Sequence, residues 1–164
     1  MTLKPCLALA TVLCALLALP ASAQNASQIA KVRGGASCPS CNLFQADLAN
    51  LELRGLNLSG ARLRQADMSA AILNRTNFAR ADLRDVNAYG AVFTGANFAG
   101  ADLTNASLVG VYLQGANLSG AKLQGANLSG AEMDRARGLG QNQLNQACGD
   151  ETTRLPPGLR IPAC

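Results

Sequence analysis

The chain has 164 residues, of which 49% are hydrophobic and 15% charged, and its formal net charge is +4. It contains no His and no Trp. The length suits a single domain with its own core, and the absence of His removes the commonest general acid/base and metal ligand, which disfavours an enzyme. The mild positive charge is not typical of a nucleic-acid-binding surface, so no nucleic-acid partner is expected.

Residues 1–23 have the pattern of an export signal. Lys4 supplies a positive start, residues 7–19 form an apolar run, and small residues precede Gln24. The apolar run is shorter than the roughly 20 residues of a transmembrane helix. We therefore expect cleavage after Ala23, no membrane span in the mature chain, and a periplasmic or secreted location, with a retained anchor as the minority alternative.

Four cysteines remain after cleavage, and an even number in an exported chain favours disulfides. They are Cys38, Cys41, Cys148 and Cys164. The spacing of the first two leaves a redox pair as an alternative to a structural disulfide. A redox Cys needs a helix N-terminus, whereas Cys41 takes an inward position of the repeat described below, which favours the structural role. The two pairs are too far apart to share one zinc ion, and neither a metal nor a cofactor is expected.

A five-residue repeat runs without interruption from residue 41 to residue 135. Of its 19 central positions, 18 hold Leu, Met or Phe, and the exception is Ala88. In 13 of the units, the residue two places before the central position is Ala. Val86 takes that usually small position in the unit of Ala88, so it is expected to restore part of the missing volume.

A period of five fits neither a helix nor a strand. Five residues of an α-helix advance about 140° past a full turn, which would spread the central residues around the helix. In a strand, side chains alternate between faces, so the central residues would alternate too. A chain that turns a corner every five residues instead directs all of them inward. Four units then close a square coil of about 20 residues, stacked on its neighbours at about 4.8 Å.

Seven units match the pattern A-(D/N)-L-x-x, in two of them with Met or Phe as the large residue. They begin Ala46-Asp47-Leu48, Ala66-Asp67-Met68, Ala81-Asp82-Leu83, Ala96-Asn97-Phe98, Ala101-Asp102-Leu103, Ala116-Asn117-Leu118 and Ala126-Asn127-Leu128. In this pattern the chain resembles the pentapeptide-repeat family. The resemblance implies an all-β fold, a right-handed quadrilateral β-solenoid in which each coil is stabilised by its neighbours.

Both ends of such a stack expose an apolar layer and unpaired backbone, so both need a cover. We divide the chain into a signal peptide, an N-terminal cap or linker, the solenoid and a C-terminal cap, at residues 1–23, 24–40, 41–135 and 136–164. In the N-terminal segment, Ser27 is expected to cap a short helix that extends to Val32.

The C-terminal segment is expected to contain a short capping helix at residues 141–148, ended by Gly149 in a left-handed conformation. A Pro-rich extended tail follows at residues 155–162. A disulfide between Cys148 and Cys164 would fasten this tail to the helix. The segment resembles the one that ends other exported pentapeptide-repeat proteins.

Residues 20 apart should share one side of the coil, which sorts the outward side chains into faces. One face carries a column of Asn57, Asn77, Asn97 and Asn117, whose amides are expected to hydrogen-bond along the stack. Another carries Asp82 and Asp102 among basic residues. These basic residues are Arg62, Arg64, Arg84 and Lys122. That arrangement predicts a solvated salt ladder and no catalytic pair.

A further face is expected to carry an exposed apolar patch, formed by Ile72, Tyr89, Val92, Val109 and Tyr112. Charged Glu52 and Glu132 bound it, and both Tyr residues of the protein belong to it. Apolar patches with a charged rim mark interfaces. The alternative is that β-branched and aromatic residues simply suit a strand surface.

These features favour a non-enzymatic, extracytoplasmic structural or protein-binding module, with an unknown protein partner or self-association through the patch. Members of the family that mimic DNA and bind topoisomerases provide one alternative. That mimicry needs a strongly negative surface, which the charge disfavours. A thiol-disulfide protein using Cys38 and Cys41 is the other alternative.

Overall fold

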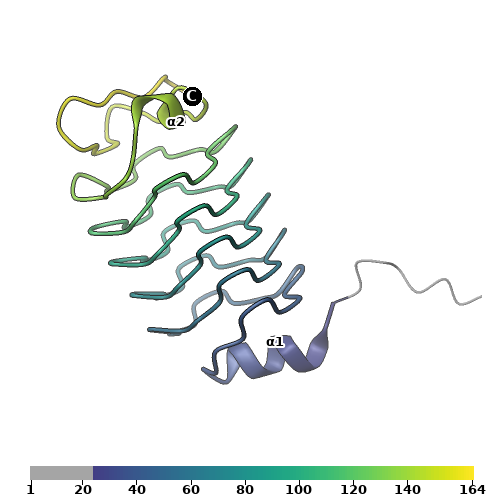
Figure 1. Ribbon diagram of the computed structural model, residues 1–164. Helices are drawn as coiled ribbons and strands as arrows, with labels where there is room; N and C mark the ends of the chain where they lie inside the picture. The colour runs from purple at the N-terminus through teal and green to yellow at the C-terminus, as the bar shows by residue number, and fades with distance from the viewer. Residues whose placement is uncertain (1–23) are drawn as a thin grey trace, which may run out of the picture.

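The computed structural model describes residues 24–164, so the export signal expected at residues 1–23 lies outside the described residues. The chain winds into a stack of coils, with helix α1 (Ala26–Arg33) at one end and helix α2 (Gln141–Leu144) at the other (Figure 1). Parallel β-bridges join residues 20 apart, from Asn42↔Arg62 to Asn117↔Arg137. This register gives the expected coil of four five-residue sides. Within residues 24–164 the pairing consists of isolated bridges, without longer strands.

The large central residues of the repeat form the core. All 19 of them, from Leu43 to Met133, are at most 4% exposed. Ala88 and the compensating Val86 are both buried. Three central Phe side chains pack together: Phe78 and Phe98 stack with ring centroids 5.1 Å apart, and Phe93 contacts both edge-on at 5.9 and 5.2 Å. Aromatic pairs at these separations add to the stabilisation that burial alone provides.

Each corner is a tight turn closed by the next small residue, as where the Ala46 N–H donates to the Leu43 carbonyl at 3.0 Å. The second turn residue is left-handed in every unit from Ser40 to Gly130. A positive φ at that place is the signature of a type II turn. The outward Asn or Asp of a unit also accepts a hydrogen bond from the backbone two residues on, as Asn57 does from Ser59 at 3.1 Å. This local bond explains the D/N position of the repeat pattern.

The N-terminal segment covers the first coil with a helix and with polar side chains. Asn25 caps α1 by accepting from the Gln28 N–H at 3.1 Å, so the expectation that Ser27 is the cap is wrong. Ser27 lies in the first turn and donates its hydroxyl to Asn25. Backbone groups on the outer edge of the first coil bind side chains instead of another strand: the Asn42 N–H donates to Gln28 Oε1 at 2.7 Å, and Arg33 donates to the Asp47 carbonyl.

The regular backbone pairing extends beyond residues 41–135 at both ends. The Cys38 N–H donates to the Asn57 carbonyl at 2.9 Å, and the Leu118 N–H donates to the Arg137 carbonyl at 2.8 Å. Cys38 is buried at 3% exposure, in the place that a central residue holds in later units. The first disulfide therefore belongs to the end of the solenoid itself.

The C-terminal segment covers the last coil by continuing its backbone pairing with a changed register. Cys148 bridges Asn127 and Arg154 bridges Glu132, so the cap adds one or two residues to the regular spacing. Helix α2 consequently ends at Leu144, shorter than the expected 141–148, because the chain must extend to reach these partners.

Gly149 has no left-handed conformation, contrary to expectation, and instead pairs with Ala163. The reason for a glycine there is close packing, because a Cβ would lie 2.8 Å from Thr153 Oγ1 and 3.0 Å from Ile161 Cγ2. A disulfide joins Cys148 to Cys164, with their Cα atoms 4.8 Å apart, and holds the tail in this position. Among residues 24–164, no helix has the length and apolar character needed to cross a membrane.

Candidate functional site

The apolar patch (Ile72, Tyr89, Val92, Val109 and Tyr112) lies on two neighbouring columns of the stack. Ile72, Val92 and Tyr112 are joined by successive bridges, which continue to Glu52 below and Glu132 above. Tyr89 and Val109 precede the adjoining corner, where the Gly90 N–H donates to the Val109 carbonyl at 2.9 Å. The backbone thus holds the five residues in three successive coils.

Exposure distinguishes the two tyrosines from the other three members of the patch. Tyr89 is 62% exposed and Tyr112 is 44% exposed, while Ile72, Val92 and Val109 are half-buried. Within residues 24–164, Tyr89 and Tyr112 are the large hydrophobic residues classed as exposed. A tyrosine offers apolar area and a hydroxyl at little entropic cost, and exposed clusters of this kind suit protein recognition.

Charged and polar side chains border this patch. The Glu52 side chain pairs with Arg54 at 2.7 Å, and Glu132 neighbours the cap residue Arg154 in the backbone ladder. Gln114 donates to Asp134, and this hydrogen bond lowers the pKa of the Asp134 carboxyl. The border therefore carries both signs of charge at each end of the stack.

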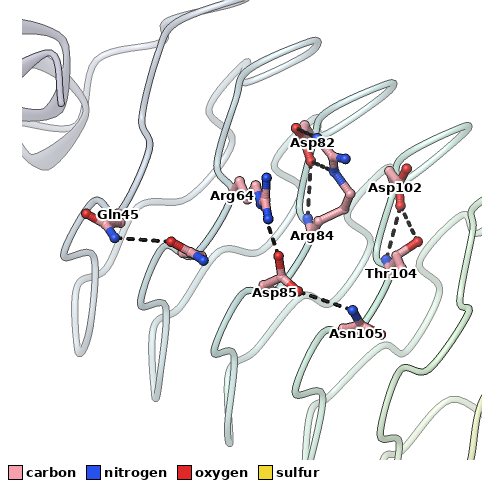
Figure 2. Close-up of polar contacts among 9 residues, drawn as sticks. Gln45, Arg64, Asp82, Arg84, Asp85, Asp102, Thr104 and Asn105 are labelled. Atoms are coloured by element: carbon pink, nitrogen blue, oxygen red, sulfur yellow. Dashed lines mark hydrogen bonds and ion pairs between the residues drawn. The ribbon is translucent and has the colours of Figure 1, made fainter. Parts of the chain in front are cut away.

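On another face, acidic and basic side chains form the expected salt network (Figure 2). Arg84 binds both oxygens of Asp82, at 2.7 and 2.6 Å, and Lys122 reaches Asp102 at 3.3 Å. Arg64 also pairs with Asp85, with 3.0 Å between Nε and Oδ2. Asp85 is a corner residue, and the prediction of the salt network did not include it. Its position as last residue of a unit could have indicated it, because corner side chains also stack 20 residues apart.

The pKa shifts on this face favour ionised carboxylates. The hydrogen bond from Arg84 lowers the pKa of Asp82 and raises that of Arg84. Burial raises the pKa of Asp102, but hydrogen bonds from Thr104 and Lys122 outweigh it and the net shift is downward. A general acid near neutral pH needs a raised pKa, whereas the pKa values of Asp82 and Asp102 are lowered. We therefore interpret this face as a surface salt network. Exposed pairs of this kind contribute at most about 1 kcal/mol each.

The column of asparagines is also present as expected. Asn77 donates to Asn57 at 3.3 Å, and each of the next two asparagines donates to the one below at 3.1 Å. The amides are occupied by one another and by the turn backbone, so this column stabilises the stack.

Cys38 and Cys41 form a disulfide, with their Cα atoms 5.5 Å apart, and are 3% and 7% exposed. Thiol-disulfide exchange requires access of an attacking thiolate to one sulfur. Burial of both residues in the first turn of the solenoid therefore supports the structural role. Among residues 24–164, no group of three or more His, Cys, Asp or Glu is placed to hold a metal ion.

Comparison with known proteins identifies the repeat. The family described as pentapeptide repeats matches in eight copies, over residues 41–78, 61–100, 76–115 and 101–137. No curated protein matches.

Several solved structures are similar. A pentapeptide repeat protein from the cyanobacterium Cyanothece 51142 is 35% identical over 63% of each chain, with a TM-score of 0.34. One from the Arabidopsis thaliana thylakoid lumen is 29% identical, over 66% of this chain and 61% of that chain, with a TM-score of 0.30. The chain thus spans about three fifths of the length of these two relatives.

QnrB1, a plasmid-mediated fluoroquinolone resistance protein, is 15% identical over 78% of this chain and 87% of its own, with a TM-score of 0.41. All three superpositions are loose, so the assignment rests on the repeat match, which covers more than half of the chain. Members of this family are generally non-enzymatic structural or binding proteins, and the matched fold is a right-handed β-solenoid. The chain belongs to the pentapeptide-repeat family.

Proposed function

We propose that this protein is a non-enzymatic, extracytoplasmic binding module that docks a protein partner on the apolar patch. The observation that carries the proposal is the exposure of Tyr89 and Tyr112, 62% and 44%, on a rigid face that also presents Ile72, Val92 and Val109. A rigid, preformed surface loses little conformational entropy on binding.

Location outside the cytoplasm is supported by the signal pattern at residues 1–23 and by two disulfides. Disulfides persist in oxidising compartments and are rare in the cytosol. Mass spectrometry of the chain recovered from the extracytoplasmic fraction tests this part. An N-terminus at Gln24 supports export with cleavage, and recovery of the uncleaved chain from the cytosol alone contradicts it.

The patch is tested by crosslinking capture from the extracytoplasmic fraction. The wild type is compared with Val92→Arg, which places a charge at the centre of the patch. Gln124→Arg is the matched control, because Gln124 is exposed on the face that carries the salt network. The proposal predicts a partner that is retained by Gln124→Arg and lost by Val92→Arg. Equal capture by all three chains contradicts it.

A further inference from the structure

The occupant of the apolar patch can be inferred from the order of residues along the stack. We propose that it is a second copy of this chain, packed face to face with its coils running in the opposite direction. The twofold axis would pass over Val92, parallel to the chain on that face. This inference rests on the proposed function, because it names the partner of the same surface.

The column that contains Val92 is nearly symmetric about that residue. Successive bridges give the order Glu52, Ile72, Val92, Tyr112, Glu132, one residue per coil. Val92 is central, its two neighbours are apolar, and both ends are acidic. An axis over Val92 sets Ile72 against the partner's Tyr112 and Val92 against its own counterpart. Such an isologous contact buries apolar side chains on apolar side chains.

The next column has complementary charges at its two ends. Two residues further along each unit stand Arg54, Asn74, Thr94, Gln114 and Asp134. The same rotation sets Arg54 against the partner's Asp134, and Asn74 against the partner's Gln114. Arg54 has 58% of its side chain exposed and Asp134 is exposed, so both remain accessible to a partner.

The acidic ends of the patch are accompanied by cations. Rotation brings Glu52 near the partner's Glu132, which alone would be repulsive. Arg54 lies 2.7 Å from Glu52, and Arg154 bridges Glu132 in the backbone ladder. Each end of the contact therefore combines three carboxylates, those of Glu52 and of the partner's Glu132 and Asp134, with two guanidinium groups, and opposite charges can alternate there.

The alternative twofold axis, along the stack, gives a poorer match. It would set each coil against the same coil of the partner with the chain direction reversed. An axis over Val92 would then set every residue of its column against its own counterpart, with Glu52 on the partner's Glu52 and Glu132 on the partner's Glu132. It would also separate Arg54 from the partner's Asp134, so the acidic ends would lose the one pair of opposite charges across the contact, which costs free energy. The sequence order thus specifies the antiparallel arrangement.

The size of the face sets the strength of the contact. Five coils at about 4.8 Å and one side of a coil span roughly 24 by 12 Å. This is well below the roughly 800 Å² per partner of a standard interface, so the dimer should be weak and concentration-dependent. We expect dissociation in the micromolar range or weaker.

Disulfide crosslinking tests the geometry directly. Ile72→Cys and Tyr112→Cys chains are purified separately from the extracytoplasmic fraction, so that the native disulfides are intact, and are then oxidised alone and as a mixture at about 1 mM. The antiparallel dimer predicts rapid crosslinking in the mixture and slow crosslinking of either chain alone. Crosslinking of each chain with itself would indicate the other axis and overturn the proposal. A mixture no faster than a Gln124→Cys control would also overturn it.

Sedimentation equilibrium of intact chains supplies the second measurement. The wild type should dimerise reversibly, Val92→Arg should remain monomeric, and Arg54→Asp should weaken association at least several-fold. Adding Asp134→Arg to Arg54→Asp should restore it, because the pair is then reversed. A wild type that stays monomeric up to about 1 mM overturns self-association. Capture of another protein that depends on Val92 would then still support the proposed function, whereas its absence would contradict both.

Discussion

The corner residue shows how the repeat tolerates a strained conformation. In the units from Ser40 to Gly130 it is left-handed throughout, with φ between 52° and 70°, although nine of these residues are not glycine. Left-handed backbone costs an L-residue about 1–2 kcal/mol, less for Asn, which hydrogen-bonds locally. Neighbouring coils offset this cost, because the corner residues from Ser40 to Gly110 each donate their N–H to a carbonyl of the next coil, as Ala70 does to Tyr89 at 2.8 Å.

Gly115 tests the cost of a corner residue. A Cβ at this position would meet no atom within 4 Å, so a substitution there changes backbone conformation alone. Gly115→Ala should lower the free energy of unfolding by about 1 kcal/mol, and Gly115→Asn by less. Urea unfolding of the three chains measures the difference. An alanine variant as stable as the wild type would contradict this view of the corner.

Phe78 tests the packing of the aromatic core. It is fully buried and contacts the rings of Phe93 and Phe98. Phe78→Ala should lower the free energy of unfolding by about 3–5 kcal/mol through lost burial and a residual cavity. Tyr89→Ala, at an exposed aromatic, is the control and should change it by about 0.5 kcal/mol or less. Similar losses in both variants would be inconsistent with the assigned inner and outer positions.

The caps are the elements in which the structure differs most from what the sequence predicts. Helix α2 is shorter than its sequence suggested, because Cys148 and Arg154 pair with the last coil instead of continuing the helix. Such long-range pairing leaves no periodic signal in a short segment. The same holds at the first coil, where Gln28 and Arg33 replace a neighbouring strand by side-chain hydrogen bonds.

The C-terminal disulfide should decide how firmly this cap is attached. The bond closes a loop with a sequence separation of 16. Replacing Cys148 and Cys164 by Ala should cost about 3 kcal/mol by the loop-entropy estimate. Hydrogen exchange of the Cys148 and Arg154 amides, which donate to the last coil, reports this loss locally. Unchanged protection of these amides would show that the cap is held without the bond.

Acid should release the cap through Asp150. This carboxylate accepts hydrogen bonds from Thr152, the Gly130 N–H and Thr153, and these lower its pKa below the ordinary value of 3.8. A carboxyl with a lowered folded-state pKa contributes stability above its unfolded-state value and loses it as pH falls through the folded-state value.

Exchange of the Gly130 amide should therefore accelerate as the pH is lowered below about 4, after correction for intrinsic exchange. Asp150→Asn keeps an acceptor oxygen but cannot titrate, so its corrected exchange should stay constant over the same range. A wild type without this pH dependence, or an Asn variant that retains it, would assign the effect to other groups.

At the scale of the whole molecule, the repeat period made most of the fold predictable. Each inward position from Leu43 to Met133 follows from the five-residue phase, and so do the columns that place Ile72, Val92 and Tyr112 together. The salt network was predictable for the same reason, except for the corner residue Asp85. The identity of a partner was not predictable, since outward residues are constrained by solvent and by binding, and the repeat specifies only their positions.

The tyrosine content of the chain provides a direct probe of whether the patch is a binding surface. The chain has two Tyr and no Trp, and both tyrosines belong to the patch. Nitration of tyrosine rings, followed by mass spectrometry, therefore reports the occupancy of this surface and no other. The decisive comparison is between the protein in its native extracytoplasmic fraction and the same protein purified and diluted. If a partner covers the patch, Tyr89 and Tyr112 should both be modified several-fold more slowly in the native fraction. Equal rates in the two samples would contradict binding at the patch.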